Sequence, residues 1–280
     1  MQHWTVGTPT TLDFDGVAAL RVRVVSGSVA VLSTDDQPRL DVADLSGQPL
    51  LVKHEAGILT VTYPDLTWDG VLGWLRPTAH SAAITIMVPR ECPTQLGVVS
   101  ASAVVSGISA TTSVKSASGK VTLDGVTGAV SATTLSGDVE AQGLTGRVGL
   151  NSVSGDLTVA DGAVEKLEAK TASGRFTADV EMNDGGALRV STISGEVAIR
   201  LPSETSTRVE LRSATGRLQS EFDGLTASHG PGTSTLSGTL GAGAGRLVVT
   251  TLSGQVTLLE RNNRDTPAAG NGPETQKDAS

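Results

Sequence analysis

The stretch that decides the fold is residues 115–160, KSASGKVTLDGVTGAVSATTLSGDVEAQGLTGRVGLNSVSGDLTVA. It repeats one phrase with a period of 18 residues, and each copy is anchored on a glycine that follows a hydroxyl-bearing residue. The anchors continue well beyond this stretch and lie at Gly119, Gly137, Gly155, Gly174, Gly195, Gly216, Gly238 and Gly254. Self-similarity at a short, nearly constant period is typical of repeat proteins.

Side chains alternate in character around each anchor. The residues two before, two after and four after the glycine are mostly apolar, as in Leu135, Val139 and Ala141 around Gly137. The residues three before and one before it are Ser or Thr in all eight copies. Strict alternation of this kind predicts a strand with one buried face, in which all three apolar positions contribute to the core.

A second apolar strand precedes each anchor, with apolar residues seven and five before the glycine, such as Val148 and Leu150 before Gly155. The phase of alternation slips between the two strands, as expected where a chain turns a corner. Two strands per period of 16 to 22 residues predict an all-β fold, a single-chain parallel β-solenoid of about eight coils. Equivalent residues of neighbouring coils would then lie about 4.8 Å apart.

Three regions are expected along the chain. Residues 1–95 do not continue the glycine phrase and read as a strand-rich N-terminal cap region, residues 96–260 as the solenoid repeats, and residues 261–280 as a disordered polar tail. The last coil, TTLSGQVTLLE, would leave an open parallel edge carrying Val256, Leu258 and Leu259. The polar run from Glu260 to Arg264 would blunt that edge, so we expect a monomer or a weak end-to-end dimer.

Composition limits the partners and the compartment. A formal charge of -8, with no basic cluster in the sequence, argues against nucleic-acid and anionic-lipid binding. The single cysteine, Cys92, excludes an intrachain disulfide. Neither a secretory signal pattern nor an apolar run long enough to form an integral membrane segment occurs, so a cytoplasmic protein is predicted.

One aromatic cluster is a candidate binding site. Tyr63, Trp68 and Trp74 lie in YPDLTWDGVLGWLRPTAH, residues 63–80, among prolines and glycines. A functional interpretation is an aromatic contact surface for a partner, a lipid interface or a ligand. The structural alternative is a flap that packs over the end of the solenoid.

The phrases TLSGDVEA, SVSGDLTV and TISGEVAI, together with ITIMVPRECPTQLGVVSASA, resemble the bacterial "putative adhesin" β-strand repeat family, a domain of unknown function also called the toastrack domain. The resemblance covers most of residues 15–260. It implies a β-strand repeat fold and an adhesin-like role or a link to envelope-stress signalling. It implies no catalytic residues.

An enzymatic function is the competing hypothesis. Asp138 and Asp156 should be neighbours on adjacent coils, and two close carboxylates could form the acid/base pair of a carbohydrate-active β-helix enzyme. The alternative is an exposed charge ladder in which Lys120 and Arg175 flank the two aspartates. The aspartates do not recur at calcium-binding spacing and the four histidines are scattered, so we predict no metal and no cofactor. The preferred interpretation is a non-enzymatic interaction scaffold for an unknown protein or envelope component.

Overall fold

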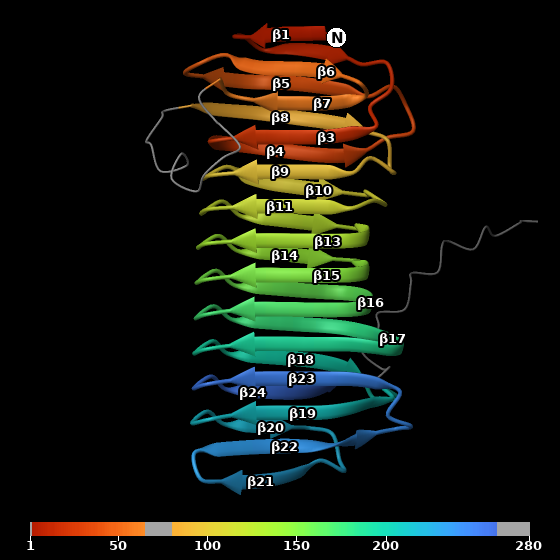
Figure 1. Ribbon diagram of the computed structural model, residues 1–280, viewed down its shortest axis with the longest axis vertical. Helices are drawn as coiled ribbons and strands as arrows, with labels where there is room; N and C mark the ends of the chain where they lie inside the picture. The colour runs from red at the N-terminus through yellow and green to blue at the C-terminus, as the bar shows by residue number, and fades with distance from the viewer. Residues whose placement is uncertain (1, 65–79, 262–280) are drawn as a thin grey trace, which may run out of the picture.

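The computed structural model describes residues 2–64 and 80–261. Within those ranges the chain forms strands and no helix, which confirms the prediction of an all-β protein, and it therefore holds no helix that could cross a membrane. Figure 1 shows an elongated stack whose strands run across the long axis. Two layers of strands pack face to face, and one continuous core of Val, Leu, Ile, Ala and Phe fills the space between them.

The first sheet contains fourteen strands or strand segments, and hydrogen-bonded neighbours follow each other in space rather than in sequence. Their order is β1 (Gln2–Val6), β6 (Leu50–Glu55), β7 (Ile58–Thr62), β3 (Ala19–Val24), β9 (Thr94–Val98), β11 (Thr112–Ser116), β13 (Thr127–Thr134), β15 (Thr145–Ser152), the second half of β16 (Leu157–Thr171), the second half of β17 (Phe176–Thr192), β23 (Gly245–Thr251), β19 (Thr207–Ser213), β22 (Thr233–Leu240) and β21 (Thr226–Gly230).

The second sheet contains twelve. Their order is β2 (Thr10–Asp13), β5 (Arg39–Ser46), β8 (Ser81–Val88), β4 (Ser26–Ser33), β10 (Ser102–Ser106), β12 (Val121–Asp124), β14 (Val139–Gln142), the first halves of β16 and β17, β18 (Val197–Pro202), β24 (Val256–Arg261) and β20 (Leu218–Ser220). β16 and β17 run continuously round the corner and so belong to both sheets.

Neighbouring strands in the middle of the stack are parallel and in register with the sequence repeat. In the pair β13 and β15, Thr127 lies opposite Thr145 and Thr134 opposite Ser152, an offset of one 18-residue period throughout. Alternate residues of these strands are buried, for example Val148 and Leu150, because successive side chains of a strand point to opposite faces. The local pattern therefore places each coil directly on the previous one.

The C-terminal end departs from sequence order. β23 pairs with β17 on one side and with β19 on the other, and β24 likewise lies between β18 and β20. The chain thus leaves one coil position empty after β18, forms β19 and β20, turns back through the antiparallel hairpin β21–β22, and fills the gap with its last coil (Figure 1).

This insertion corrects two expectations. Gly238, an anchor in the sequence phrase, lies in β22, which is antiparallel to β19, with Val209 opposite Gly238. Val256 and Leu258, expected at an open edge, are fully buried inside the stack. The end of the stack is formed instead by the hairpin β21–β22, so the predicted blunting role of Glu260 and Arg261 does not apply.

The N-terminal end contains a similar insertion. β3 lies between β7 and β9, and β4 lies between β8 and β10, all in parallel, while β5, β6, β1 and β2 add antiparallel strands outside them. Residues 19–33, within the region 1–95 expected as a cap, form a coil of the parallel stack. Ser26 and Gly27 are in register with the repeat phrase. Val29 and Val31, two and four residues after Gly27, align through Ala103 and Val105 with the residues two and four after Gly119.

Candidate functional site

The turn that carries the glycine phrase joins the two sheets along one narrow side of the stack. In six of the eight copies the hydroxyl oxygen of the Ser or Thr three residues before the glycine accepts a hydrogen bond from the glycine N–H, and in five of these six that Ser or Thr is buried. Thr134 accepts from Gly137 at 2.8 Å, and Thr251 from Gly254 at 2.8 Å. The hydroxyl thus satisfies a backbone donor that the corner removes from the ladder, which explains the Ser/Thr at this position.

The glycine itself is required by close stacking. A Cβ atom on Gly137, Gly155 or Gly174 would lie 2.0 to 2.2 Å from the carbonyl oxygen of the equivalent glycine in the preceding coil. No real Cβ contact is that short, so backbone passes directly over backbone at this corner. The same contact joins Gly254 to Gly195 and Gly216 to Gly254, which follows the spatial order of the coils and not the sequence order.

The residue one before the glycine ties neighbouring turns together. Ser136 donates both its N–H (2.9 Å) and its hydroxyl (3.3 Å) to the carbonyl of Ala117, which lies in the neighbouring turn. Ser154 makes the same pair of bonds to the carbonyl of Leu135, and Ser253 to that of Ile193. The two Ser/Thr columns of the sequence phrase are therefore bonded to backbone and fix the geometry of the turns.

The apolar residue two before the glycine does not enter the core, contrary to the sequence prediction. Leu135, Val153, Ile193 and Leu252 are 55%, 49%, 56% and 57% exposed. The hydroxyl three before the glycine takes the inward place at the corner, so the following side chain points outward. We call the column formed by Leu135, Val153, Ala172, Ile193 and Leu252 the turn ridge.

The turn ridge is continuous in space. Bonds from the Ser residues of successive turns go to the carbonyls of Leu135, Val153, Ala172 and Ile193, so the residues of the ridge stack one coil apart. Five coils at about 4.8 Å give a row roughly 19 Å long. Among the described residues, four of the five large hydrophobic side chains that are exposed belong to this row. Apolar side chains gathered in this way are typical of interaction surfaces.

The aspartates proposed as an acid/base pair are neighbours, but their oxygens serve the backbone. Asp138 Oδ1 accepts a hydrogen bond from Asp156 N–H at 3.0 Å, and Asp156 Oδ1 accepts one from Arg175 N–H at 2.8 Å. Arg175 in turn pairs with Glu196 at 3.2 Å, and Lys120 pairs with Glu140 at 2.7 Å. The arrangement is the exposed charge ladder of the alternative hypothesis, with each carboxylate linking two coils.

The aromatic candidates are divided. Tyr63 is fully buried and stacks on His80 with 4.9 Å between ring centroids, so its ring is not presented to a partner. His80 is also buried, and its Nδ1 accepts a hydrogen bond from Gln48 N–H at 3.2 Å. Trp68 and Trp74 lie outside the described residues. Their proposed role in binding stays a prediction.

Two further features could have carried chemistry. Cys92 is buried, and burial raises the pKa of its thiol to about 11, so it is a neutral core residue near neutral pH. In the parts of the chain that the structure describes, no three His, Cys, Asp or Glu side chains gather as metal ligands would. A groove of about 350 Å³ lies between the turn at Gly216 and the hairpin β21–β22, and it includes Arg217 and His229.

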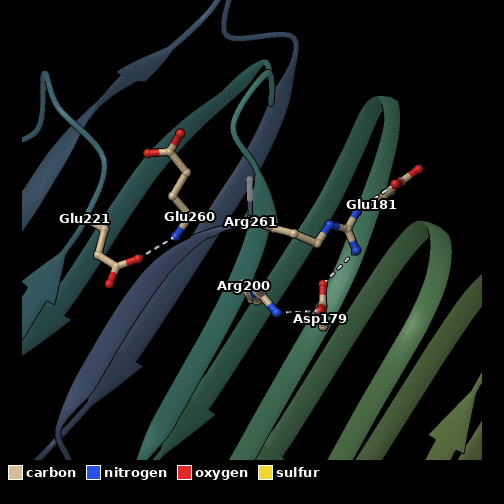
Figure 2. Close-up of polar contacts among 6 residues, drawn as sticks. All are labelled: Asp179, Glu181, Arg200, Glu221, Glu260 and Arg261. Atoms are coloured by element: carbon tan, nitrogen blue, oxygen red, sulfur yellow. Dashed lines mark hydrogen bonds and ion pairs between the residues drawn. The ribbon is translucent and has the colours of Figure 1, made fainter. Parts of the chain in front are cut away.

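The last described residues are fastened to the stack by charge. Figure 2 shows Arg261 of β24 reaching to β17, where it donates to Asp179 Oδ1 at 2.8 Å and to Glu181 Oε1 at 2.6 Å. Glu260 N–H donates to Glu221 Oε2 at 3.0 Å, and Arg200 of the intervening strand lies 3.7 Å from Asp179. The C-terminal end of β24 is thus held by ion pairs with β17, about 80 residues earlier in the chain, and by a backbone hydrogen bond to Glu221, about 40 residues earlier.

This chain is similar to several solved structures and matches one family model. Solved structures similar in fold include a "putative adhesin" of Bacteroides fragilis (11% identity, 90% of this chain and 97% of that chain covered, TM-score 0.37) and a "putative lipid binding protein" of Parabacteroides distasonis (14%, 92% and 98%, 0.41). A "putative cell adhesion protein" of Clostridium sporogenes matches at 11% identity over 91% and 100% of the two chains, with a TM-score of 0.25. No curated protein matches. The family model Toastrack DUF4097 matches residues 42–259, and the chain therefore belongs to this toastrack family.

Proposed function

We propose that this chain is a non-enzymatic interaction scaffold that binds a protein partner along the turn ridge. The observation that carries the proposal is the collection of Leu135, Val153, Ile193 and Leu252 in one exposed column. Apolar side chains that remain half exposed in the free protein lose that exposure when a partner packs on them, and each then contributes favourably to binding.

The rigidity of the corner supports the same function. The backbone under each ridge residue is held by the Ser and Thr hydroxyl bonds and by glycine stacking, so the side chains are presented at fixed spacing. A partner that matches this spacing binds with a small loss of conformational entropy in the scaffold. This is an adhesin-like mode of action, in which contact rather than chemistry is the output.

The enzyme hypothesis receives no such support. Asp138 and Asp156 each accept a backbone hydrogen bond from the next coil, which suits a structural role. A cytoplasmic location, a link to envelope-stress signalling, an envelope component as partner, and the monomer or weak end-to-end dimer remain predictions.

Site-specific photocrosslinking tests the proposal. A benzophenone amino acid at position 193 should crosslink a distinct partner protein in cells that naturally make this chain, and the same probe at Gln142, an exposed position of β14, is the control. We expect the crosslinked product at position 193 only, and its loss when Leu135 and Leu252 are both changed to Ser. Equal crosslinking from both positions, or crosslinking only to a second copy of the chain, would overturn the proposal.

A further inference from the structure

Positive charge gathers on the outward face of the first sheet in the C-terminal half of the stack. The exposed cations are Lys166 and Lys170 on β16, Arg189 on β17, Arg246 on β23, and Arg208 and Arg212 on β19. We call these six residues the basic face.

The basic face carries six positive charges and the two negative charges of Glu168 and Glu210, so its net charge is +4. The whole chain carries a net charge of -8. Glu165, at the start of the second half of β16, is 3.7 Å from Arg147 of β15, so that pair cancels. The basic face is therefore a local reversal of the overall charge of the molecule.

The insertion of the last coil creates this face. In the register, Arg246 of β23 lies opposite Ala187 on one side and opposite Arg208 on the other. Arg246 and Arg208 come from strands that are 38 residues apart, and only the placement of β23 next to β19 makes them neighbours. The sequence, read in order, shows no basic cluster here, because each strand contributes only one or two cations.

The two carboxylates are engaged by cations of the face. Glu168 lies 2.9 Å from Lys170 and 3.6 Å from Lys166, and the hydrogen bond and charge of Lys170 lower its pKa. Glu210 pairs with Arg212 and, at 3.7 Å, with Arg246. Both glutamates are about two-thirds shielded, with 32% and 28% exposure, so the surface that solvent meets is chiefly cationic.

Arg189 and Arg208 are the open positions. Both are exposed, and neither forms an ion pair with the residues that the structure describes. They lie on β17 and β19, two strand spacings apart and offset by two residues along the strands, so their Cα atoms are roughly 12 Å apart. Glu168 lies opposite Arg189 in the register, but it pairs with Lys166 and Lys170. An external anion placed over each guanidinium would therefore stabilise these two exposed cations.

The chemistry of the surrounding side chains selects among anionic partners. Among the described residues, no aromatic side chain lies on the outward positions of β16, β17, β23 and β19, so the face offers no platform for stacking bases. Between the cations the outward residues of β17 and β23 are Ala187, Ser191, Thr250 and the half-buried Val248, and two small or half-buried apolar side chains do not form an apolar surface that could enter a membrane. Hydroxyls and arginines on a flat sheet suit hydroxylated sugars that carry carboxylates.

We propose that the basic face binds a linear acidic polysaccharide with carboxylates on successive sugar rings, lying across the strands from β16 to β19. Arg189 and Arg208 would each take one carboxylate in a bidentate contact, since the planar fork of arginine matches a carboxylate. This site is separate from the turn ridge and does not depend on the proposed protein partner.

Calorimetric titration with polygalacturonate tests the proposal, and fully methyl-esterified polygalacturonate is the matched neutral probe. We expect binding of the charged polymer only, and weaker binding as salt concentration rises. Changing both Arg189 and Arg208 to Gln should weaken binding about tenfold or more. Changing Lys120 to Gln, which removes an exposed cation from a different face, should leave the affinity unchanged.

The comparison of affinities requires that the variants keep the fold of the unmodified chain, and thermal melting followed by circular dichroism tests whether they do. Both arginines are exposed, so their replacement should leave melting nearly unchanged. Equal binding of the esterified polymer, or an unchanged affinity in the double variant, would overturn the proposal. Binding of phosphatidylglycerol vesicles or of single-stranded oligothymidylate as tight as that of polygalacturonate would also overturn it, since the face would then be an unspecific anion surface.

Discussion

At the scale of single residues, the glycine of the phrase is fixed by contact between neighbouring coils. Gly155 does not have the positive φ that often explains a glycine. The constraint is instead the carbonyl oxygen of Gly137, which would lie 2.0 Å from an added Cβ. Because this oxygen belongs to a backbone held on both sides, it has little freedom to move.

Gly155→Ala should therefore destabilise the protein by several kcal/mol, roughly the cost of overpacking a core. Gly149 is the matched control, because an added Cβ there would lie 3.9 Å from its nearest neighbour and φ is not positive. Gly149→Ala should be neutral or stabilise the protein by up to about 1 kcal/mol. Urea unfolding of both variants measures the difference. Equal midpoints would show that the coils can separate at this corner at little cost.

Two isoleucines of the same phrase have opposite environments. Ile193, two before Gly195, is 56% exposed, whereas Ile199, four after it, is fully buried. Ile199→Ser should cost about 3 to 5 kcal/mol, because it removes apolar volume and buries a hydroxyl. Ile193→Ser should cost under about 1 kcal/mol. Thermal melting of both variants measures the difference. A large drop in the melting temperature of Ile193→Ser would mean that the turn ridge contributes to the core.

At the scale of elements, the last strand of the chain does not lie at an end of the stack. β24 lies between β18 and β20, and its C-terminal end is tied by Arg261 to β17 and by Glu260 to Glu221 (Figure 2). Arg261 is 21% exposed and the partner Asp179 is 28% exposed, so these contacts are partly shielded from water. Partly shielded charged hydrogen bonds stabilise a fold more than surface ion pairs do.

A chain that ends at Leu259 should have a free energy of unfolding roughly 1 to 3 kcal/mol lower than one that ends at Arg261, because the two hydrogen bonds of Arg261 are lost. Urea unfolding of both chains measures the difference. The chain ending at Arg261 is the control for loss of residues 262–280. Light scattering should find the same oligomeric state for both, since neither truncation exposes a parallel edge. Association of the shorter chain alone would indicate that β24 lies at an end of the stack after all.

At the scale of the whole molecule, both ends of the first sheet and the N-terminal end of the second are covered by antiparallel strands, while β20 is the last strand of the second sheet at the other end. The hairpin β21–β22 covers β19, and β5, β6, β1 and β2 cover the coil formed by β7 and β8. Every residue of β21 is exposed, and the strand contains Ser228, His229 and Gly230. A short, polar edge of this kind is a weak template for pairing with another chain.

Removing residues 226–240 and joining the remaining ends with a short Gly/Ser linker should expose the edge of β19, where Val209 and Leu211 lie in the core. We expect concentration-dependent association by light scattering, together with retained β-sheet circular dichroism. The full chain at the same concentrations is the control. A shortened chain that stays monomeric with a cooperative melt would show that β19 needs no cover.

The middle of the stack and the family resemblance could be predicted from the sequence, because both depend on local features. Alternation of Val148, Leu150, Leu157 and Val159 buries one face of each strand, and the 18-residue offset of β13 and β15 repeats the same contacts in every coil. Each coil needs only its two neighbours, so a repeated phrase is enough to specify a repeated structure.

The order of the coils at the ends and the surfaces made by that order were decided only by tertiary structure. Every coil offers the same glycine, hydroxyl and apolar columns, so β17 could stack on β19 or on β23 with similar local contacts. The antiparallel hairpin β21–β22 lies on one side of β19, so β23 takes the position between β19 and β17. A sequence period alone does not specify this order of coils. The outward turn of Leu135 and the pairing of Arg246 with Arg208 in the basic face follow from the corner geometry and from this non-local pairing, respectively.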